Sequence, residues 1–230
     1  MDQLTIRGRK INLPLFPEEA TLEMVKSLNL ASGLASRFDF SSATVRALDI
    51  KDARLTEGKI SSVRTESTSI AAADVRCVEF SNCELGHLRW AGGRISQTRF
   101  NGCKLLGAKF ENVFMEHVVF TDCKIDYAAL NQMRTSGPVM FIRCSLREAE
   151  FTGCDMTRSL MDECDLALVN FESGKYAGFD LRGNDLSGLR GVHYLRRAII
   201  DYAQLIQISQ ALAAELEITF GDELDDPRRR

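Results

Sequence analysis

The sequence predicts an all-β solenoid, a quadrilateral parallel β-helix of about seven to eight coils, followed by one C-terminal α-helix. Large apolar residues recur at every fifth position from Phe40 to Leu186, with one residue inserted around Ser136-Gly137-Pro138, and 28 of these 30 quintets have an apolar centre. Neither the helical period of 3.6 nor the strand period of 2 produces this pattern. Residues 20 positions apart also share a type, which groups four quintets into one coil.

The four columns of quintet centres differ in kind, as expected when each face of a coil stacks on itself. One column is mostly Phe, the next is aliphatic, the third is aromatic-rich and includes Trp90, and the fourth is mixed. We expect Trp90, the only tryptophan, to fill the core. In sequence order the columns begin Phe40, Ile60, Phe80; Val45, Thr65, Leu85; Ile50, Ile70, Trp90; and Leu55, Val75, Ile95.

Six of the seven cysteines lie two positions before a centre, in a slot otherwise held by small residues. The slot is therefore expected to face inward, where cysteine acts as a small hydrophobe. A metal site would instead show CxxC pairs or mixed Cys/His clusters. Five of the six are separated by 20, 20, 21 and 20 residues, which supports the four-quintet coil independently: Cys83, Cys103, Cys123, Cys144 and Cys164.

The two ends lack the five-residue period. Residues 1–35 predict an N-terminal cap with a strand near Leu4-Ile6, a proline-containing loop over 13–17 and a short helix over 18–27. Residues 36–188 form the repeat. Residues 189–220 predict a helix with Asp201 as N-cap and Gln204 closing a capping box, then a strand over 217–220. A charged, disordered tail over 221–230 is expected last.

The composition excludes several classes of protein. The chain has 230 residues, 45% of them hydrophobic, and a formal net charge of −3, whereas a nucleic-acid-binding domain would carry a basic excess. No apolar run is long enough to cross a bilayer, and no charged start leads into an apolar signal segment. We therefore expect a cytoplasmic protein that binds neither membrane nor nucleic acid directly, and unpaired buried thiols fit a reducing compartment.

A search for chemistry finds no P-loop, GxGxxG, HExxH or GxSxG motif. His87 and His117 are 30 residues apart, one and a half coils, so they are expected on opposite faces and cannot share a metal or form a catalytic dyad. Acidic pairs such as Asp162-Glu163 fall in predicted turns, where solvation is the ordinary role. We expect no enzyme activity, no cofactor and no metal.

The repeat resembles the pentapeptide-repeat family, whose motif is a small residue, Asp or Asn, Leu or Phe, and two variable residues. Recognisable copies are Ala149-Glu150-Phe151-Thr152-Gly153, Cys164-Asp165-Leu166 and Cys83-Glu84-Leu85. The resemblance covers about residues 36–188 and implies a right-handed quadrilateral β-helix. The sequence departs from the motif at the Asp/Asn position, which carries seven basic residues through the middle of the repeat: Arg89, Arg94, Arg99, Lys104, Lys109, Lys124 and Arg134.

The segment Ile200-Asp201-Tyr202-Ala203-Gln204-Leu205 resembles the C-terminus of the Qnr and MfpA branch of this family, which interacts with gyrase. There a helix with a leucine stripe follows the last coil and joins two chains, which implies homodimerisation. Capping of its own rod is the alternative role of the helix. The expected dimer interface is Leu205, Ile208, Leu212, Leu216 and Ile218.

Two functions follow from these features. The first is a DNA-mimicking dimer that binds a type II topoisomerase, gyrase or topoisomerase IV, and protects it from inhibitors; the second is a general protein-interaction scaffold. Duplex DNA carries one charge per about 1.7 Å of axis, so a mimic needs a regular acidic stripe. The candidate stripe lies in the last coils, where residues 145–186 have nine acidic and four basic side chains. Eight of the nine acidic residues form the predicted stripe: Glu148, Glu150, Asp155, Asp162, Glu163, Asp165, Asp180 and Asp185.

Overall fold

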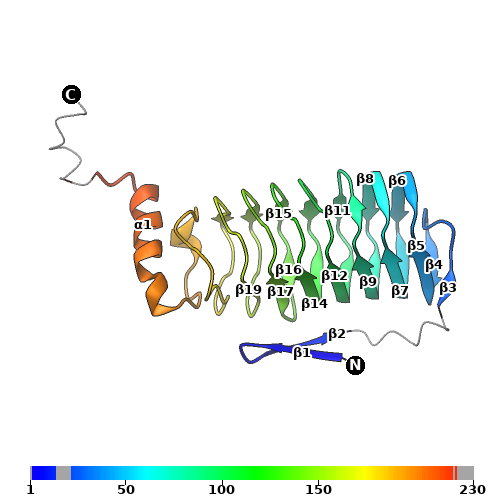
Figure 1. The fold of residues 1–230 in the computed structure, drawn as a ribbon, viewed down its shortest axis with the longest axis horizontal. Coiled ribbons are helices and arrows are strands. Elements are labelled where there is room, and N and C mark those ends of the chain that lie inside the picture. The colour runs from blue at the N-terminus through cyan, green and yellow to red at the C-terminus, as the bar shows by residue number, and fades with distance from the viewer. Residues whose placement is uncertain (1, 14–21, 220, 222–230) are drawn as a thin grey trace.

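The computed structural model describes residues 2–13, 22–219 and 221, and shows a straight rod with a helix across its C-terminal end (Figure 1). The predicted right-handed quadrilateral β-helix is confirmed. We name each face of the rod after one of its centres: the Phe80, Leu85, Trp90 and Ile95 faces. One parallel sheet covers the Ile95 and Phe80 faces, and a second covers the Leu85 and Trp90 faces.

The strands differ in length along the rod. The longest run eight or nine residues around a corner, whereas the last ones before the C-terminal cap have three. The sheet on the Ile95 and Phe80 faces contains β3 (Glu23–Met24), β4 (Gly33–Ser36), β5 (Phe38–Ser41), β7 (Ala53–Ser61), β9 (Asp74–Ser81), β12 (Arg94–Asn101), β14 (Phe114–Thr121), β16 (Arg134–Thr135), β17 (Val139–Ile142) and β19 (Leu160–Asp162). The other sheet contains β6 (Thr44–Lys51), β8 (Arg64–Ala71), β10 (Glu84–Leu85), β11 (Arg89–Ala91), β13 (Lys109–Glu111), β15 (Ala129–Asn131), β18 (Glu150–Thr152) and β20 (Asn170–Glu172).

The register of the parallel strands confirms the coil of 20 residues. Phe80, Phe100 and Phe120 are paired in succession, with ring centroids 4.6 Å apart at each step. Phe120 then pairs with Phe141, a step of 21 residues that absorbs the insertion after Thr135. Ring stacking at this spacing adds to the burial energy of each aromatic side chain.

Trp90 is fully buried and fills the core as predicted. Its ring stacks on Phe110 and meets the edges of Phe80 and Phe100. The two polar centres of the repeat also have partners: the Thr65 hydroxyl lies 2.7 Å from that of Thr68, and the Thr135 hydroxyl donates to a backbone carbonyl 2.9 Å away. The repeat therefore tolerates threonine at a centre because its hydroxyl is hydrogen-bonded.

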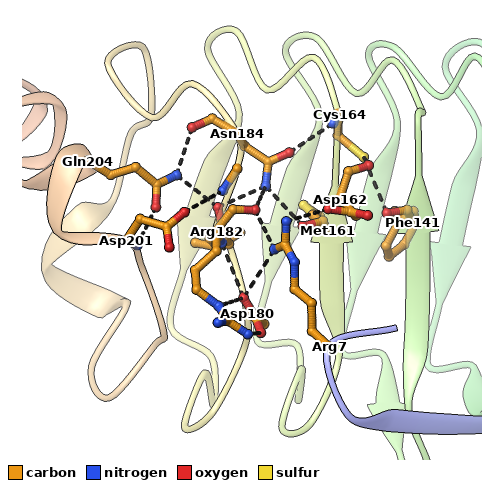
Figure 2. A network of polar contacts seen from close by, with 12 residues as sticks. Arg7, Phe141, Met161, Asp162, Cys164, Asp180, Arg182, Asn184, Asp201 and Gln204 are labelled. Carbon is orange, nitrogen blue, oxygen red and sulfur yellow. Dashed lines mark hydrogen bonds and ion pairs between the residues drawn. The ribbon is translucent and has the colours of Figure 1, made fainter. Parts of the chain in front are cut away.

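The cysteine slot is inward-facing, as predicted, and each thiol of its main column donates to a backbone carbonyl one coil earlier. Cys103 Sγ lies 3.4 Å from the carbonyl oxygen of Phe80. The same contact continues past the last cysteine, because Asn184 Nδ2 donates to Met161 O at 2.9 Å and Gln204 Nε2 donates to Leu181 O at 3.0 Å. Figure 2 shows these amides joining the last coil to the helix cap.

The N-terminal segment differs from the expected cap. The predicted strand at Leu4-Ile6 is present in β1 (Asp2–Ile6), which forms an antiparallel hairpin with β2 (Arg9–Leu13). This hairpin lies along the side of the rod and not across its end (Figure 1). The helix predicted over 18–27 is wrong for residues 22–27, where β3 pairs with β5 and begins the rod; the proline loop at 14–17 lies outside the described residues.

The C-terminal cap begins with the predicted capping box. The backbone N–H of Asp201 donates to Gln204 Oε1 at 2.6 Å, and a 3₁₀ turn (Tyr202–Gln204) leads into α1 (Leu205–Glu215). The predicted strand over 217–220 is wrong for residues 217–219, which form a turn and irregular chain; of the predicted tail, only residue 221 is described. None of the described helices has the length and apolar character needed to span a bilayer.

Candidate partner-binding surfaces

The predicted acidic residues lie on all four faces of the rod and do not line up along one. The Phe80 face carries three, the Leu85 face three, and the Trp90 and Ile95 faces one each. In that order they are Asp162, Glu163 and Asp180; Glu148, Asp165 and Asp185; Glu150; and Asp155. The register of the strands therefore separates residues that are close in sequence, because each quintet turns the chain onto the next face.

Several of these carboxylates are already paired within the chain. Asp162 and Arg7 are 2.5 Å apart, Asp165 and Arg147 3.1 Å, and Asp155 and Lys175 3.9 Å. A paired cation offsets the negative charge that a partner would meet at these positions. The exposed members of the set are Glu148, Glu150, Glu163, Asp165 and Asp185.

Asp180 is buried, with its side chain 1% exposed, so it is a structural group. Arg182 donates two hydrogen bonds to it, and Arg7 lies 3.4 Å away (Figure 2). Burial raises the pKa of Asp180, but the hydrogen bonds and charge of Arg182 and the charge of Arg7 outweigh burial and hold this pKa below its ordinary value.

The basic residues of the middle coils are also distributed over the four faces. Arg89 pairs with Glu111 at 2.9 Å, Lys104 with Glu84 at 3.4 Å, and Arg94 with Glu116. By column, Arg99 lies on the Phe80 face, Lys104 and Lys124 on the Leu85 face, Arg89 and Lys109 on the Trp90 face, and Arg94 and Arg134 on the Ile95 face. Every face therefore presents both signs of charge.

A basic hollow lies where the last coils meet the C-terminal cap. Its volume is about 500 Å³, and its polar lining includes Lys175, His193, Arg196 and Arg197. Tyr194 also lines it, with its ring centroid 3.9 Å from that of His193. Positive charge thus interrupts the acidic region at the end of the rod.

The helix α1 has one side packed on the rod and another exposed. Gln204 and Ala211 are buried, Ile208 packs against the core, and Gln207 Oε1 accepts a hydrogen bond from the backbone N–H of Leu186. Leu212 is half-buried. Of the predicted interface, the exposed residues are therefore Leu205 (49%), Leu216 (62%) and Ile218 (52%).

Two exposed apolar residues of this surface fall outside the predicted stripe. Tyr202 is 91% exposed and Ile206 is 69% exposed. Ile206 follows Leu205 directly, and an i, i+3, i+7 stripe omits it. The sequence contained one signal for Ile206: the apolar residues of this helix cover a wider arc than a single packed face requires.

The histidines of the rod lie far apart and, in the part of the chain that the structure describes, do not form a site with other metal-binding side chains. His87 and His117 lie on the opposite Leu85 and Ile95 faces, as predicted, and each contacts backbone: His87 Nδ1 lies 2.9 Å from Glu66 O, and the N–H of Asn12 donates to His117 Nδ1. Within the described residues, no three His, Cys, Asp or Glu side chains are grouped so that they could hold a metal ion.

Comparison with known proteins gives one sequence match and several weak structural ones. Residues 93–171 match the model of the pentapeptide repeat region. A trypsin-treated variant of QnrB1, a plasmid-mediated fluoroquinolone resistance protein, is 14% identical, with a TM-score of 0.41 over 82% of this chain and 99% of its own. HetL, a pentapeptide repeat protein involved in heterocyst differentiation regulation in the cyanobacterium Nostoc, is also 14% identical, with a TM-score of 0.34 over 75% and 89%.

None of the curated proteins matches the chain. Similarities to solved structures at these scores leave the partner of this chain open. The sequence match and the stacked coils of four quintets instead identify the repeat. Residues 93–171 of this chain are a pentapeptide repeat region.

Proposed function

We propose that this chain is a non-enzymatic, cytoplasmic protein-binding rod that acts as a homodimer joined end to end through the exposed side of α1. The observation that carries the proposal is that α1 has two different sides. One side completes the cap of the rod, and the other leaves Leu205, Ile206 and Leu216 exposed. A contiguous exposed apolar patch is typical of an interaction site, and one self-complementary patch suffices for a twofold dimer.

The dimer is tested by Ile206→Asp, with the mass in solution measured by light scattering. Ile206 is 69% exposed, so its loss leaves the cap intact, whereas Leu212 is half-buried and a charge there would also disturb the packing. Ser69→Asp is the matched control, because it places the same charge at an exposed position of β8, at the opposite end of the rod from α1. We expect a monomer for Ile206→Asp and a dimer for the wild type and the control. If the wild type is monomeric at about 100 µM, the dissociation constant is weaker than that of a specific interface, and the dimer is contradicted.

The mixed charge of every face supports a scaffold that recognises protein partners by local patches. A dimer doubles each patch about the twofold axis, so two weak contacts act together. The partner is identified by crosslinking from exposed positions of the rod, with the Ile206→Asp monomer as the comparison. Loss of the crosslinked partner in the monomer supports a bivalent scaffold.

A second candidate is a DNA mimic that binds a type II topoisomerase. The exposed carboxylates Glu148, Glu163 and Asp165 of the last coils favour it, because dimerisation through α1 would bring two such regions to the centre of the double rod. The distribution over four faces and the basic hollow weaken it, since a mimic needs an uninterrupted stripe.

Gyrase supercoiling and fluoroquinolone-induced DNA cleavage test this candidate directly. The wild type is compared with Glu163→Lys, which reverses one exposed charge of the acidic region, and with Asp52→Lys, which makes the same change at the opposite end of the rod. Inhibition or protection that is weakened several-fold by Glu163→Lys alone supports mimicry. No effect of the wild type at large molar excess contradicts it.

A further inference from the structure

The outer surface of the Phe80 face changes character in its middle coils. Outward residues just before the centres are charged in the first four coils, apolar in the next three, and acidic again at Asp180. The apolar residues are buried although they point away from the rod core. We call the apolar strip the four residues Val119, Met140, Ile142 and Leu160.

The hairpin β1–β2 covers this strip. Ile11 and Leu13 are 0% and 2% exposed, and Leu4 and Ile6 pack around them. These residues and the strip form a second hydrophobic cluster, separate from the core inside the rod. The strip is therefore shielded from water by a segment more than 100 residues away in sequence.

Polar contacts surround the apolar centre. Arg7 donates to Asp162 Oδ1 and to the carbonyl of Arg182, each at 2.5 Å (Figure 2), and Arg9 donates to the carbonyl of Gly178. The N–H of Asn12 donates to His117 Nδ1 at 3.4 Å. An apolar centre with a hydrogen-bonded polar rim is the arrangement of a protein–protein interface.

The hairpin is docked on the rod and is not a further coil. Its strands pair antiparallel with each other, whereas the strands of the rod stack in parallel. A cleft of about 340 Å³ remains along its edge, lined by Leu4 and Leu13 from the hairpin and by Val119, Arg99 and Arg143 from the rod.

From these observations we propose that the apolar strip is a docking surface for a β-hairpin, that residues 2–13 are its intramolecular ligand, and that the hairpin of a second copy of the chain binds the same strip. The hairpin is the one occupant whose fit is shown by the structure. Intramolecular docking has an effective concentration near the millimolar range for a short tether. In the wild type, docking within one chain therefore outcompetes binding of a second chain. Binding between chains can be detected when one chain lacks a functional hairpin and the other lacks a functional apolar strip.

Two full-length variants test the exchange. Ile11→Asp places a charge at the buried centre of the hairpin and empties the strip, whereas Leu160→Asp destroys the strip and frees an intact hairpin; both changes lie outside the core of the rod. Both chains also carry Ile206→Asp, so that association through α1 cannot produce a complex. Ser61→Asp, at an outward position of the same face beyond the hairpin, is the matched control.

Hydrogen exchange of residues 9–13 and the mass in solution are measured for each variant and for the mixture. The amides of the strip are paired with neighbouring coils whether or not the hairpin is docked, whereas an isolated two-stranded hairpin is marginally stable in water. We expect exchange at the hairpin amides to be at least about tenfold faster in Leu160→Asp than in the control. Mixing with Ile11→Asp should restore protection in the Leu160→Asp chain and give a complex of two chains.

The proposal is overturned if both variants keep the protected core of a folded rod but form no complex when mixed. The mixture is measured at about 100 µM of each chain, which is below the millimolar effective concentration of docking within one chain. It is also overturned if Leu160→Asp leaves exchange over residues 9–13 unchanged, because the hairpin is then protected without the strip. Leu13→Asp, which removes the other buried residue of β2, replaces Ile11→Asp if that chain does not fold.

Discussion

The inside and the outside of the rod wall follow different rules. Inside, residues 20 apart repeat the same role, as Phe80, Phe100 and Phe120 do in one continuous stack. Outside, the same column changes from Arg99 to Val119 within one coil. The inner positions are constrained by neighbours above and below, whereas the outer positions are free to vary with what binds them. Stability is thus encoded in what repeats, and recognition in what does not.

The largest test of this contrast replaces one inner ring. Phe100→Ala should lower the free energy of unfolding by about 3–5 kcal/mol, because the cavity cannot collapse between two stacked rings. Asn101→Ala, at the next outward position, should change it by less than about 0.5 kcal/mol. Urea denaturation measures both, and equal effects of the two substitutions would abolish the distinction between inside and outside.

A second test concerns the polar end of the inner cysteine column. Asn184→Leu should cost about 2–3 kcal/mol, because it leaves the carbonyls of Met161 and Leu181 and the N–H of Cys164 without this partner. Cys144→Ala, which removes a single buried Sγ atom two coils earlier in the same column, should cost about 1 kcal/mol. A smaller loss for Asn184→Leu than for Cys144→Ala would show that the amide network is dispensable.

A third test uses pH. The pKa of Asp180 is below its ordinary value in the folded chain, because contacts with Arg182 and Arg7 outweigh burial. The stabilisation is therefore fully present above the unfolded pKa, roughly 4, and is lost as pH falls through the lower folded pKa. Asp180→Asn should cost about 1–2 kcal/mol at pH 7.

The difference between the wild type and Asp180→Asn should shrink as the pH is lowered below about 4. Unfolding at pH 7, 5 and 3.5 measures it, and Asp52→Asn, at an exposed position in the first coils, is the control. A difference that is constant over this range would assign the effect to packing and not to charge.

The smallest effect is expected at the corners, where the wall turns. Every coil reaches its corners through residues with left-handed φ, and Tyr127 (φ 60°) stacks one coil after Gly107 (φ 62°). Tyr127→Gly should raise the free energy of unfolding by about 0.5 kcal/mol, since relief of left-handed strain exceeds the extra entropy of the unfolded chain. Gly107→Tyr is the reciprocal change, and thermal unfolding should show the opposite sign.

The repeat made the interior predictable residue by residue. A period of five fixes which side chain faces inward, so Trp90, the cysteine slot and the insertion near Pro138 were all placed correctly from sequence. Position relative to the repeat also fixes the face of each charged residue, yet the acidic residues of the last coils were expected to form one stripe and instead lie on four faces. The acidic residues could be counted from sequence, but their ion pairs with Arg7 and Arg147 depend on side-chain geometry.

The N-terminal segment was less predictable for a physical reason. The alternation in residues 9–13 is compatible with a strand, but its partner could be any apolar surface. The strip that it covers is formed by Val119, Met140 and Leu160, which become neighbours only when three coils stack. Local sequence contains no information on that pairing, so an end cap was expected where a lateral hairpin is found.

The sequence by itself determined the wall of the rod, because a strict period leaves one way to bury every centre. Tertiary structure alone decided what lies on that wall: the hairpin on the apolar strip, the ion pairs of Asp162 with Arg7 and of Asp165 with Arg147, and the division of α1 into a packed and an exposed side. These features join residues from different coils or from the ends, and such long-range contacts follow no local period.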